Sequence, residues 1–317
     1  MRASLDFKKF VFSLEAREPI ILPSYKGSTL RGGFGNAFRR VVCALRRDDC
    51  VSCLLKEKCV YSYVFETPPP SNAKIMRKYR FAPHPFVIEP PPERKRAYRP
   101  GEDIIFGLTL MGRALDYLPY FVYTFDELGR IGIGSGRGRY DLREVATDGV
   151  SIYNIRDKTL KSFARSALLI NMSLDNENLS VCLPAGRLTL RFLTPTRIVF
   201  DEHLTPDLEF HILVRNFLRR LALLYYFHGE GDFSDWDFRG VIAKAKGIKV
   251  KGSELKWYEL RRYSTRQDRK VQMGGLVGEI TFEGPIGPFL PLIRAGEILH
   301  VGKGTTFGLG KYEIVSA

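Results

Sequence analysis

Four of the five cysteines lie within one short stretch of the chain, and their spacing is typical of a metal site. The pattern C-x6-C-x2-C-x5-C offers four thiolates, and its central C-x2-C can hold a metal ion from one tight turn. Disulfides are disfavoured in the cytoplasm, where we expect this chain, so we interpret the cluster as a metal site. A closed set of thiolates favours structural zinc, although an iron–sulfur cluster uses the same ligands, and free thiols or a facultative disulfide stay open. The predicted ligands are Cys43, Cys50, Cys53 and Cys59.

Two glycine-rich segments, residues 129–138 and 302–310, each precede a strand-like stretch. Glycine allows positive φ and a close approach of backbone to ligand, so exposed amides in such a loop can bind phosphate oxygens. A dinucleotide-binding fingerprint would need a helix after the glycines, and no Gly-Lys-Ser or Gly-Lys-Thr completes a P-loop. The segments are therefore either tight turns or phosphate-binding loops. The candidate contacts are Arg137, Arg139, Gly302, Lys303, Gly304, Thr305, Gly308 and Gly310.

The charge balance indicates a polyanionic partner. The 317 residues include 49 Lys and Arg against 35 Asp and Glu, a net charge of +14. Such an excess attracts a polyanion, and binding is favoured by the release of the polyanion's counterions. Nucleic acid is therefore the leading partner class, and charge that only aids solubility is the alternative. Residues 5–14 are too short and too charged for a signal peptide, and no apolar run approaches the ~20 residues that span a bilayer. We therefore expect a cytoplasmic protein with no membrane partner.

The chain contains an internal duplication. Residues 136–142, Gly-Arg-Gly-Arg-Tyr-Asp-Leu, recur as residues 308–314, Gly-Leu-Gly-Lys-Tyr-Glu-Ile, at an offset of 172. The same offset pairs Gly132 with Gly304 and the Leu-Pro dipeptide at 118 with that at 290. A collinear series over about 35 residues indicates two copies of one fold.

Each copy shows the order strand, helix, two strands, helix, strand, which is the ferredoxin-like order. Apolar alternation predicts the first strands at residues 5–14 and 187–193, and helical spacing predicts the helices at 28–42 and 208–226. Later strands are expected at 103–111, 257–263 and 276–282. We therefore predict tandem ferredoxin-like (RRM-like) α+β domains at 1–150 and 180–317, with a cysteine-rich insertion at about 43–65. Residues 162–170 in the connecting stretch could form a linker helix or a strand.

Several motifs together resemble a known family. Residues 300–314, His-Val-Gly-Lys-Gly-Thr-Thr-Phe-Gly-Leu-Gly-Lys-Tyr-Glu-Ile, resemble the signature loop of CRISPR-associated repeat-processing endoribonucleases of the RAMP superfamily. Further similarity lies in Tyr-Ser-Thr-Arg-Gln at 263–267, Gly-Gly-Leu-Val-Gly at 274–278, Leu-Arg-Gly-Gly-Phe-Gly at 30–35 and the first glycine loop at 132–138. These motifs cover both halves, and the cysteines suggest the subgroup with a four-cysteine insertion in the first domain.

The resemblance implies an enzyme that binds CRISPR repeat RNA and cuts a long precursor once per repeat. It implies chemistry without a metal or other catalytic cofactor: the ribose 2′-hydroxyl attacks the adjacent phosphate, leaving a 2′,3′-cyclic phosphate and a 5′-hydroxyl. Such a reaction needs a base, an acid and cations for the charged transition state. The alternative is a non-catalytic repeat RNA-binding subunit of a CRISPR effector complex.

In the catalytic residues the chain departs from the family pattern. Relatives often carry a histidine on the first helix, where this chain has Asn36, and an amide cannot transfer protons near neutral pH. The candidates are instead Tyr25, Lys26 and Arg31 around the start of that helix, and His300 beside the second glycine loop. Basic residues near family-like motifs are candidate RNA contacts: Arg39, Arg40, Arg261, Arg262 and Arg266.

Overall fold

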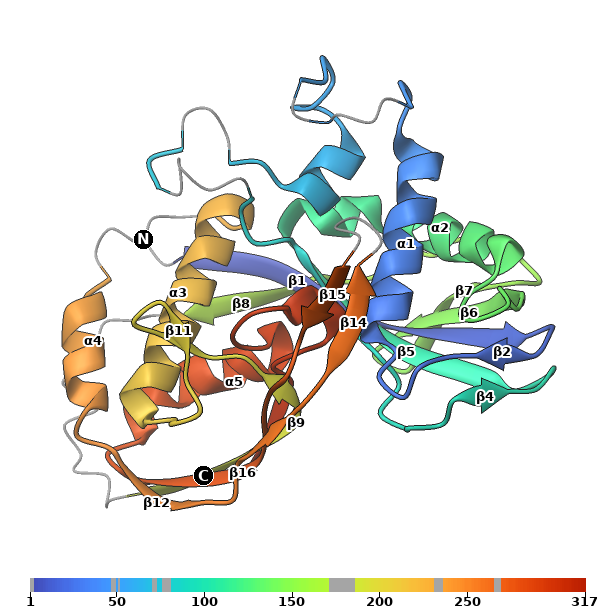
Figure 1. Cartoon of the computed structure of the whole chain (residues 1–317). Helices are drawn as coiled ribbons and strands as arrows, with labels where there is room; N and C mark the ends of the chain where they lie inside the picture. The colour runs from blue at the N-terminus through green and yellow to red at the C-terminus, as the bar shows by residue number, and fades with distance from the viewer. Residues whose placement is uncertain are drawn as a thin grey trace. The chain divides into compact units, whose positions relative to one another are not determined.

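The computed structural model describes residues 3–46, 50, 52–69, 73–75, 81–170, 186–230, 236–264 and 269–317. These residues divide into two compact units. The N-terminal unit contains Leu5–Ala167 together with Phe227–Gly229, and the C-terminal unit contains Met1–Ser4, Leu168–Tyr226 and Glu230–Ala317. Figure 1 shows the helices and strands of each.

The N-terminal unit has the predicted βαββαβ order. Its core elements are β1 (Ala3–Ala16), α1 (Gly27–Val42), β3 (Phe86–Glu89), β5 (Asp103–Met111), α2 (Leu118–Ile131) and β6 (Tyr140–Thr147). The antiparallel sheet has the order β3-β5-β1-β6, which is the ferredoxin-like order, and β7 (Val150–Asn154) extends it beside β6. The short strands β2 (Ile20–Ile21) and β4 (Ala97–Tyr98) form a separate pair.

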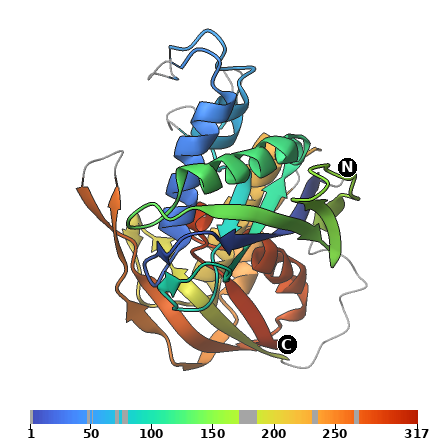
Figure 2. The ribbon, with the colours of Figure 1, turned by 90° about the vertical axis from the view of Figure 1, so that its right-hand side faces the viewer.

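Aromatic side chains build the core of this unit. Alternate residues of β1, among them Phe10, Phe12 and Leu14, are buried, as expected for a strand with one face against helices. Helices α1 and α2 cover that face (Figure 1; Figure 2), and the Phe34 ring of α1 stacks on the Phe125 ring of α2 at 5.0 Å between centroids. This packing fixes the face of α1 that points outward.

The C-terminal unit repeats the same topology. Its core elements are β9 (Gly186–Thr196), α3 (Phe210–His228), β12 (Lys249–Ser253), β16 (Gly275–Gly284), α5 (Leu290–Leu299) and β17 (Tyr312–Ser316). The sheet order β12-β16-β9-β17 again matches the ferredoxin-like order. The remaining elements of this unit are β10 (Val199–Phe200), β11 (His203–Leu204), α4 (Phe238–Ala245), β13 (Lys256–Tyr258), β14 (Arg261–Ser264) and β15 (Arg269–Gln272). Strand β8 (Ser166–Ile170) pairs with β1.

The two halves share a buried tyrosine at the start of the last sheet strand. The Tyr140 hydroxyl donates to the Phe125 carbonyl at 2.8 Å, and the Tyr312 hydroxyl donates to the Ile293 carbonyl. A glycine of the preceding helix lies against each ring: a Cβ on Gly129 or Gly296 would collide with Tyr140 or Tyr312. The duplication seen in the sequence is therefore a repeated packing unit, and the tandem ferredoxin-like prediction is confirmed.

The predicted strands need two corrections. The second strand of the first half, β3, was not predicted, because it is a short buried run between proline-rich stretches and has no alternation. In the second half residues 257–263 are not the second core strand; that role belongs to β12, whose residues are all exposed and so carry no apolar signal. Residues 166–170 form strand β8, not a helix.

Candidate functional site

The second glycine loop is folded by its own backbone. The amides of Val301 and Phe307 donate to the carbonyls of Gly310 and Gly304, at 3.1 and 3.0 Å. The end of β9 holds the other side: the Lys303 amide donates to the Arg197 carbonyl at 3.0 Å, and the Gly310 amide donates to the Pro195 carbonyl at 3.2 Å. These amides are therefore committed to the loop fold and do not point to a ligand.

Glycine is required at several positions of this loop. Gly302, Gly304, Gly308 and Gly310 have φ between 73° and 83°, in the left-handed region that disfavours side chains. Space is also lacking, because a Cβ on Gly310 would lie 1.8 Å from the Val301 carbonyl oxygen and one on Gly302 would lie 2.4 Å from the Arg197 carbonyl oxygen. The sequence pattern is thus explained by the shape of the loop.

Only the tip of the loop faces solvent. Lys303 is exposed between the half-buried Gly302 and Gly304, whereas Thr305, Gly308 and Gly310 are buried. The predicted RNA contacts therefore fall into two groups. Residues 302–304 form a surface, which we call the loop tip, and the other three support it; contact of either group with RNA stays a prediction.

His300 lies at the base of this loop, at the end of α5. Its side chain is 0% exposed, and Nδ1 lies 3.1 Å from the Leu309 carbonyl oxygen. A carbonyl only accepts, so Nδ1 carries the proton in this bond. Its φ of 59° places it in the left-handed region, where the chain turns from α5 into the loop. In this conformation His300 positions the loop and is not open to solvent.

Two arginines lie close to the loop in the C-terminal unit. The Arg262 guanidinium of β14 lies 4.6 Å from the centroid of the Phe307 ring. Arg197 follows β9, and its Nη1 donates to the Gln272 carbonyl at 2.5 Å. Burial lowers the pKa of both guanidinium groups, which reflects partial loss of their hydration. Arg261 is exposed on the same strand, and Arg266 lies outside the described residues.

Lys26 precedes α1 in the N-terminal unit, and its ammonium points inward. The side chain is 0% exposed, and Nζ donates to the Glu93 carbonyl at 2.6 Å. Glu93 also accepts from the Tyr98 hydroxyl through Oε1 at 2.7 Å. Burial lowers the pKa of Lys26, and the Glu93 carboxylate partly offsets this. As it stands, the residue ties the 93–98 segment to the start of α1.

The other candidates near α1 differ in exposure. Tyr25 is half-buried, and burial raises the pKa of its phenol, so it is a neutral hydroxyl at pH 7. The Arg31 guanidinium lies 4.4 Å from the centroid of the Phe65 ring. Asn36 is exposed on the outward face of α1, where it offers an amide to solvent.

The basic residues of the first half also differ. Arg139 is held by Glu18, whose Oε1 accepts from Nε at 2.8 Å, whereas Arg137 is exposed at the tip of the first glycine loop with φ of 53°. On α1, Arg40 is exposed, and the Arg39 guanidinium lies 5.7 Å from the centroid of the Tyr61 ring. Arg40, Arg137 and Arg139 are thus all exposed, and Arg139 is paired with Glu18.

The four predicted metal ligands follow α1 and are half-buried thiols. Burial raises the pKa of the Cys50 thiol, and the nearby Glu66, Cys43 and Cys59 raise it further. Within the described part of the chain, no three His, Cys, Asp or Glu side chains come together in a metal-binding group. A metal at these cysteines stays a prediction.

The N-terminal unit also contains a pocket that no pattern in the sequence indicates. It has a volume of about 420 Å³, and it lies beside the cysteine-rich insertion. The Tyr63 hydroxyl lies 3.0 Å from His228 Nδ1, and His228 Nε2 lies 2.7 Å from the Pro83 carbonyl oxygen. From the sequence, His228 looks like a loop residue before a glycine. No spacing signal could connect residues so far apart in the chain.

Comparisons with known proteins agree with this fold. The class is that of a duplicated ferredoxin-like protein with a glycine-rich loop before each final sheet strand. The family model AF_1859_N, an N-terminal domain, matches residues 5–164, and that of the CRISPR-associated endoribonuclease Cas6 matches residues 190–312. Residues 190–312 are therefore similar to the Cas6 family of CRISPR-associated endoribonucleases, in agreement with the resemblance of the glycine-loop motif.

Solved structures share the fold over nearly the whole chain. A Cas6 product complex aligns over 98% of this chain and 99% of its own, at 17% identity and a TM-score of 0.56. Cas6 of Thermus thermophilus aligns over 98% of this chain and 99% of its own, at 16% identity and a TM-score of 0.53. A partial Cas6-RT-Cas1–Cas2 complex aligns over 99% of this chain and 46% of its own, at 14% identity and a TM-score of 0.58.

One curated relative also matches. An uncharacterized protein of Archaeoglobus fulgidus is 25% identical over 136 residues, which are 42% of this chain and 44% of that protein. The match thus spans less than half of the relative. Separately, none of the described helices combines the length and apolar character needed to cross a membrane.

Proposed function

We propose that this protein binds CRISPR repeat RNA and cuts the precursor transcript into guide units. The observation that carries the proposal is the loop tip, Gly302 to Gly304, where Lys303 is exposed within the segment that matches the Cas6 endoribonuclease model. Lys303 supplies charge there, and the Arg262–Phe307 pair supplies a stacking platform of the kind that suits unpaired bases.

The proposed reaction is metal-independent. The ribose 2′-oxygen attacks the adjacent phosphorus and loses its proton to a base, while the bond from phosphorus to the 5′-oxygen breaks and that oxygen takes a proton from an acid. The products are a 2′,3′-cyclic phosphate and a 5′-hydroxyl. Cations near the phosphate stabilise the charge of the transition state.

Among the predicted catalytic residues, Lys26 is the one whose lowered pKa suits an acid or a phosphate ligand. To act, its ammonium would exchange the Glu93 carbonyl for the scissile phosphate. Tyr25 precedes it in the chain and contributes a neutral hydroxyl, while His300 supports the loop from within.

A specific observation favours a second function, that of a non-catalytic repeat RNA-binding subunit of a CRISPR effector complex. Asn36 presents an amide on the exposed face of α1, and the ammonium of Lys26 is already hydrogen-bonded. In that case the loop tip binds RNA and no bond is cut.

The two functions are separated by one experiment. The full chain is incubated with the repeat RNA of its own host in EDTA, and the product ends are mapped. Cleavage with a 2′,3′-cyclic phosphate supports the first proposal, and retained binding without a cut supports the second. Loss of cleavage in EDTA would refute the metal-independent mechanism. The control is an RNA with a 2′-deoxyribose at the cut, which the enzyme should bind and leave intact.

We also propose that Cys43, Cys50, Cys53 and Cys59 hold a structural zinc ion, with an iron–sulfur cluster as the alternative. Support comes from the C-x6-C-x2-C-x5-C spacing of the four thiols. The ion would fix the insertion after α1 and would take no part in the cut.

A further inference from the structure

The pocket beside the cysteine-rich insertion is lined by residues of mixed chemistry. Its wall residues come from the insertion, the proline-rich stretch after it, the turn after β5 and the end of α3: Lys56, Glu57, Ser62, Tyr63, Thr67, Pro68, Pro69, Ala82, Arg113, Phe227 and His228. All of them belong to the N-terminal unit. A volume of about 420 Å³ is in the range of small-molecule sites and can hold a single nucleotide.

His228 forms a fixed polar group in the pocket wall. It is 9% exposed, and its Nε2 must donate to the Pro83 carbonyl, because a carbonyl only accepts. In the neutral imidazole Nδ1 is then the acceptor, and the Tyr63 hydroxyl donates to it. These bonds hold the Tyr63 ring in place in the pocket wall.

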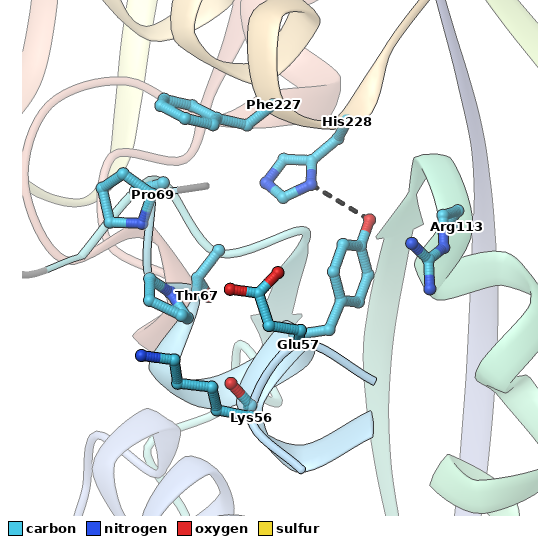
Figure 3. Close-up of a pocket in the computed structure, with 11 residues that line it drawn as sticks. Lys56, Glu57, Thr67, Pro69, Arg113, Phe227 and His228 are labelled. Carbon is cyan, nitrogen blue, oxygen red and sulfur yellow. Dashed lines mark hydrogen bonds between the residues drawn. The ribbon is translucent and has the colours of Figure 1, made fainter. Parts of the chain in front are cut away.

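Charged side chains of both signs surround the space. Figure 3 shows Lys56 and Arg113 on different sides of the pocket, with the Glu57 carboxylate directed between them. The Arg113 guanidinium lies 4.9 Å from the centroid of the Tyr63 ring, and Nη2 donates to the Tyr117 hydroxyl at 2.8 Å. Since Arg113 is exposed and has five N–H donors, donors remain for an anion.

A buried hydroxyl adds to the polar wall. Ser62 is 2% exposed, and among the described residues its Oγ has no hydrogen-bond partner. Buried hydroxyls are normally hydrogen-bonded, so a polar ligand group in the pocket would satisfy this one. Pro68, Pro69 and Phe227 provide the apolar part of the wall.

We propose that this pocket binds one unpaired nucleotide of an RNA strand, with the base beside Tyr63 and Phe227 and a phosphate at the Arg113 guanidinium. The Glu57 carboxylate accepts from the base, which favours guanine, because guanine presents two adjacent N–H donors that match a carboxylate. A purely anionic ligand fits less well because of Glu57, and a purely apolar one because of the charges. The inference rests on the proposed function, since it assumes an RNA partner.

Short RNAs test the site without cleavage. The full chain is titrated by calorimetry with a uridine pentanucleotide and with versions carrying a central guanosine or inosine, which lacks the 2-amino donor. We expect the guanosine RNA to bind roughly tenfold tighter than the inosine RNA. Glu57→Gln should abolish that preference, and Arg113→Ala should weaken the binding of all three RNAs. Both residues are exposed, so these variants should fold.

The matched control is Arg187→Ala, which removes an exposed arginine that pairs with Glu283 in the other unit. It should leave the preference for guanosine unchanged. Equal binding of guanosine and inosine RNAs, or a preference that survives Glu57→Gln, would overturn the proposed nucleotide site. Repeat RNA binding and cleavage are measured on the same proteins. If repeat RNA binding and cleavage persist while the short RNAs show no preference for guanosine, only the pocket proposal fails. If the repeat RNA neither binds nor is cut while the preference for guanosine is present, the proposed function fails.

Discussion

The Tyr63 hydroxyl lies 3.0 Å from Nδ1 of His228, although 165 positions separate the two residues in the sequence. The Pro83 carbonyl fixes the imidazole from its other side. Burial raises the pKa of Tyr63, so the phenol stays protonated and acts as the donor to His228. The bond joins the cysteine-rich insertion after α1 to the segment Phe227–Gly229 within the N-terminal unit.

Removing this hydroxyl should destabilise the N-terminal unit. Tyr63→Phe leaves the ring and deprives the buried Nδ1 of His228 of its donor, so the free energy of unfolding should fall by about 1 kcal/mol. The measurement is urea unfolding followed by fluorescence. Tyr123→Phe on α2 is the control, because Tyr123 is 52% exposed, and it should change little. Equal stability of the two variants would show that the bond contributes nothing.

The topology could be predicted from the sequence because its signals are local. The repeated glycines and the tyrosines at 140 and 312 reveal the duplication, and each has a steric cause in the structure. Strand β12 could not be found, because all its residues are exposed and only pairing with β16 defines it. Strand formation there depends on a partner far away in the chain.

The candidate site was predicted less completely. The loop around Lys303 follows from its glycines, whereas the burial of Lys26 and His300 depends on neighbours such as the Glu93 and Leu309 carbonyls. No local pattern encodes such contacts. The same holds for the pocket around His228, whose walls come from four separate stretches of the chain.

Gly310 should tolerate no side chain. Gly310→Ala places a Cβ 1.8 Å from the Val301 carbonyl oxygen at a φ of 73°, so overpacking and backbone strain together should cost about 2 to 4 kcal/mol. The C-terminal unit should unfold at a lower urea concentration, and affinity for repeat RNA should fall at least tenfold. Gly252→Ala is the control, because nothing lies within 4 Å of its Cβ position. Wild-type stability in Gly310→Ala would contradict the described loop.

Lys303 should act on RNA through charge alone. Its side chain is exposed at the loop tip, so Lys303→Ala should weaken repeat RNA binding without altering stability. Loss of one phosphate contact should reduce the slope of log affinity against log salt by about 1. Filter binding at several salt concentrations gives this slope. Lys251→Ala is the control, because Lys251 is an exposed lysine near Glu283. An equal loss of slope in this variant would mean that the effect comes from net charge and not from a phosphate contact.

Lys26 should make stability depend on pH in the alkaline range. Its pKa is lowered in the folded protein, while an unfolded lysine has a pKa of about 10.4. Between these two pKa values the unfolded state binds more protons, so the free energy of unfolding contributed by Lys26 should increase as the pH rises. Urea unfolding of the wild type and Lys26→Met from pH 7 to 10 should show a difference that grows in favour of the wild type. Lys251→Met is the control, and parallel curves for Lys26→Met would refute the lowered pKa.

The cysteine-rich insertion should hold a metal ion that takes no part in RNA cleavage. Protein purified without chelator should carry about one zinc ion per chain by mass spectrometry of the metal, and Cys50→Ser should remove most of it. An ion that binds only the folded state at a hundred times its dissociation constant adds about 2.7 kcal/mol, so its removal by EDTA should lower the melting temperature by roughly 5 to 10 °C.

Repeat RNA cleavage by the EDTA-treated protein should continue below that melting temperature, because the proposed step needs no metal. Cys182→Ser is the control, since Cys182 lies far from the other four cysteines in the sequence. Iron in place of zinc, together with absorption of visible light, would identify an iron–sulfur cluster instead. Full metal content in Cys50→Ser would remove that residue from the ligands, because a tetrahedral site with three thiolates binds zinc less tightly than one with four.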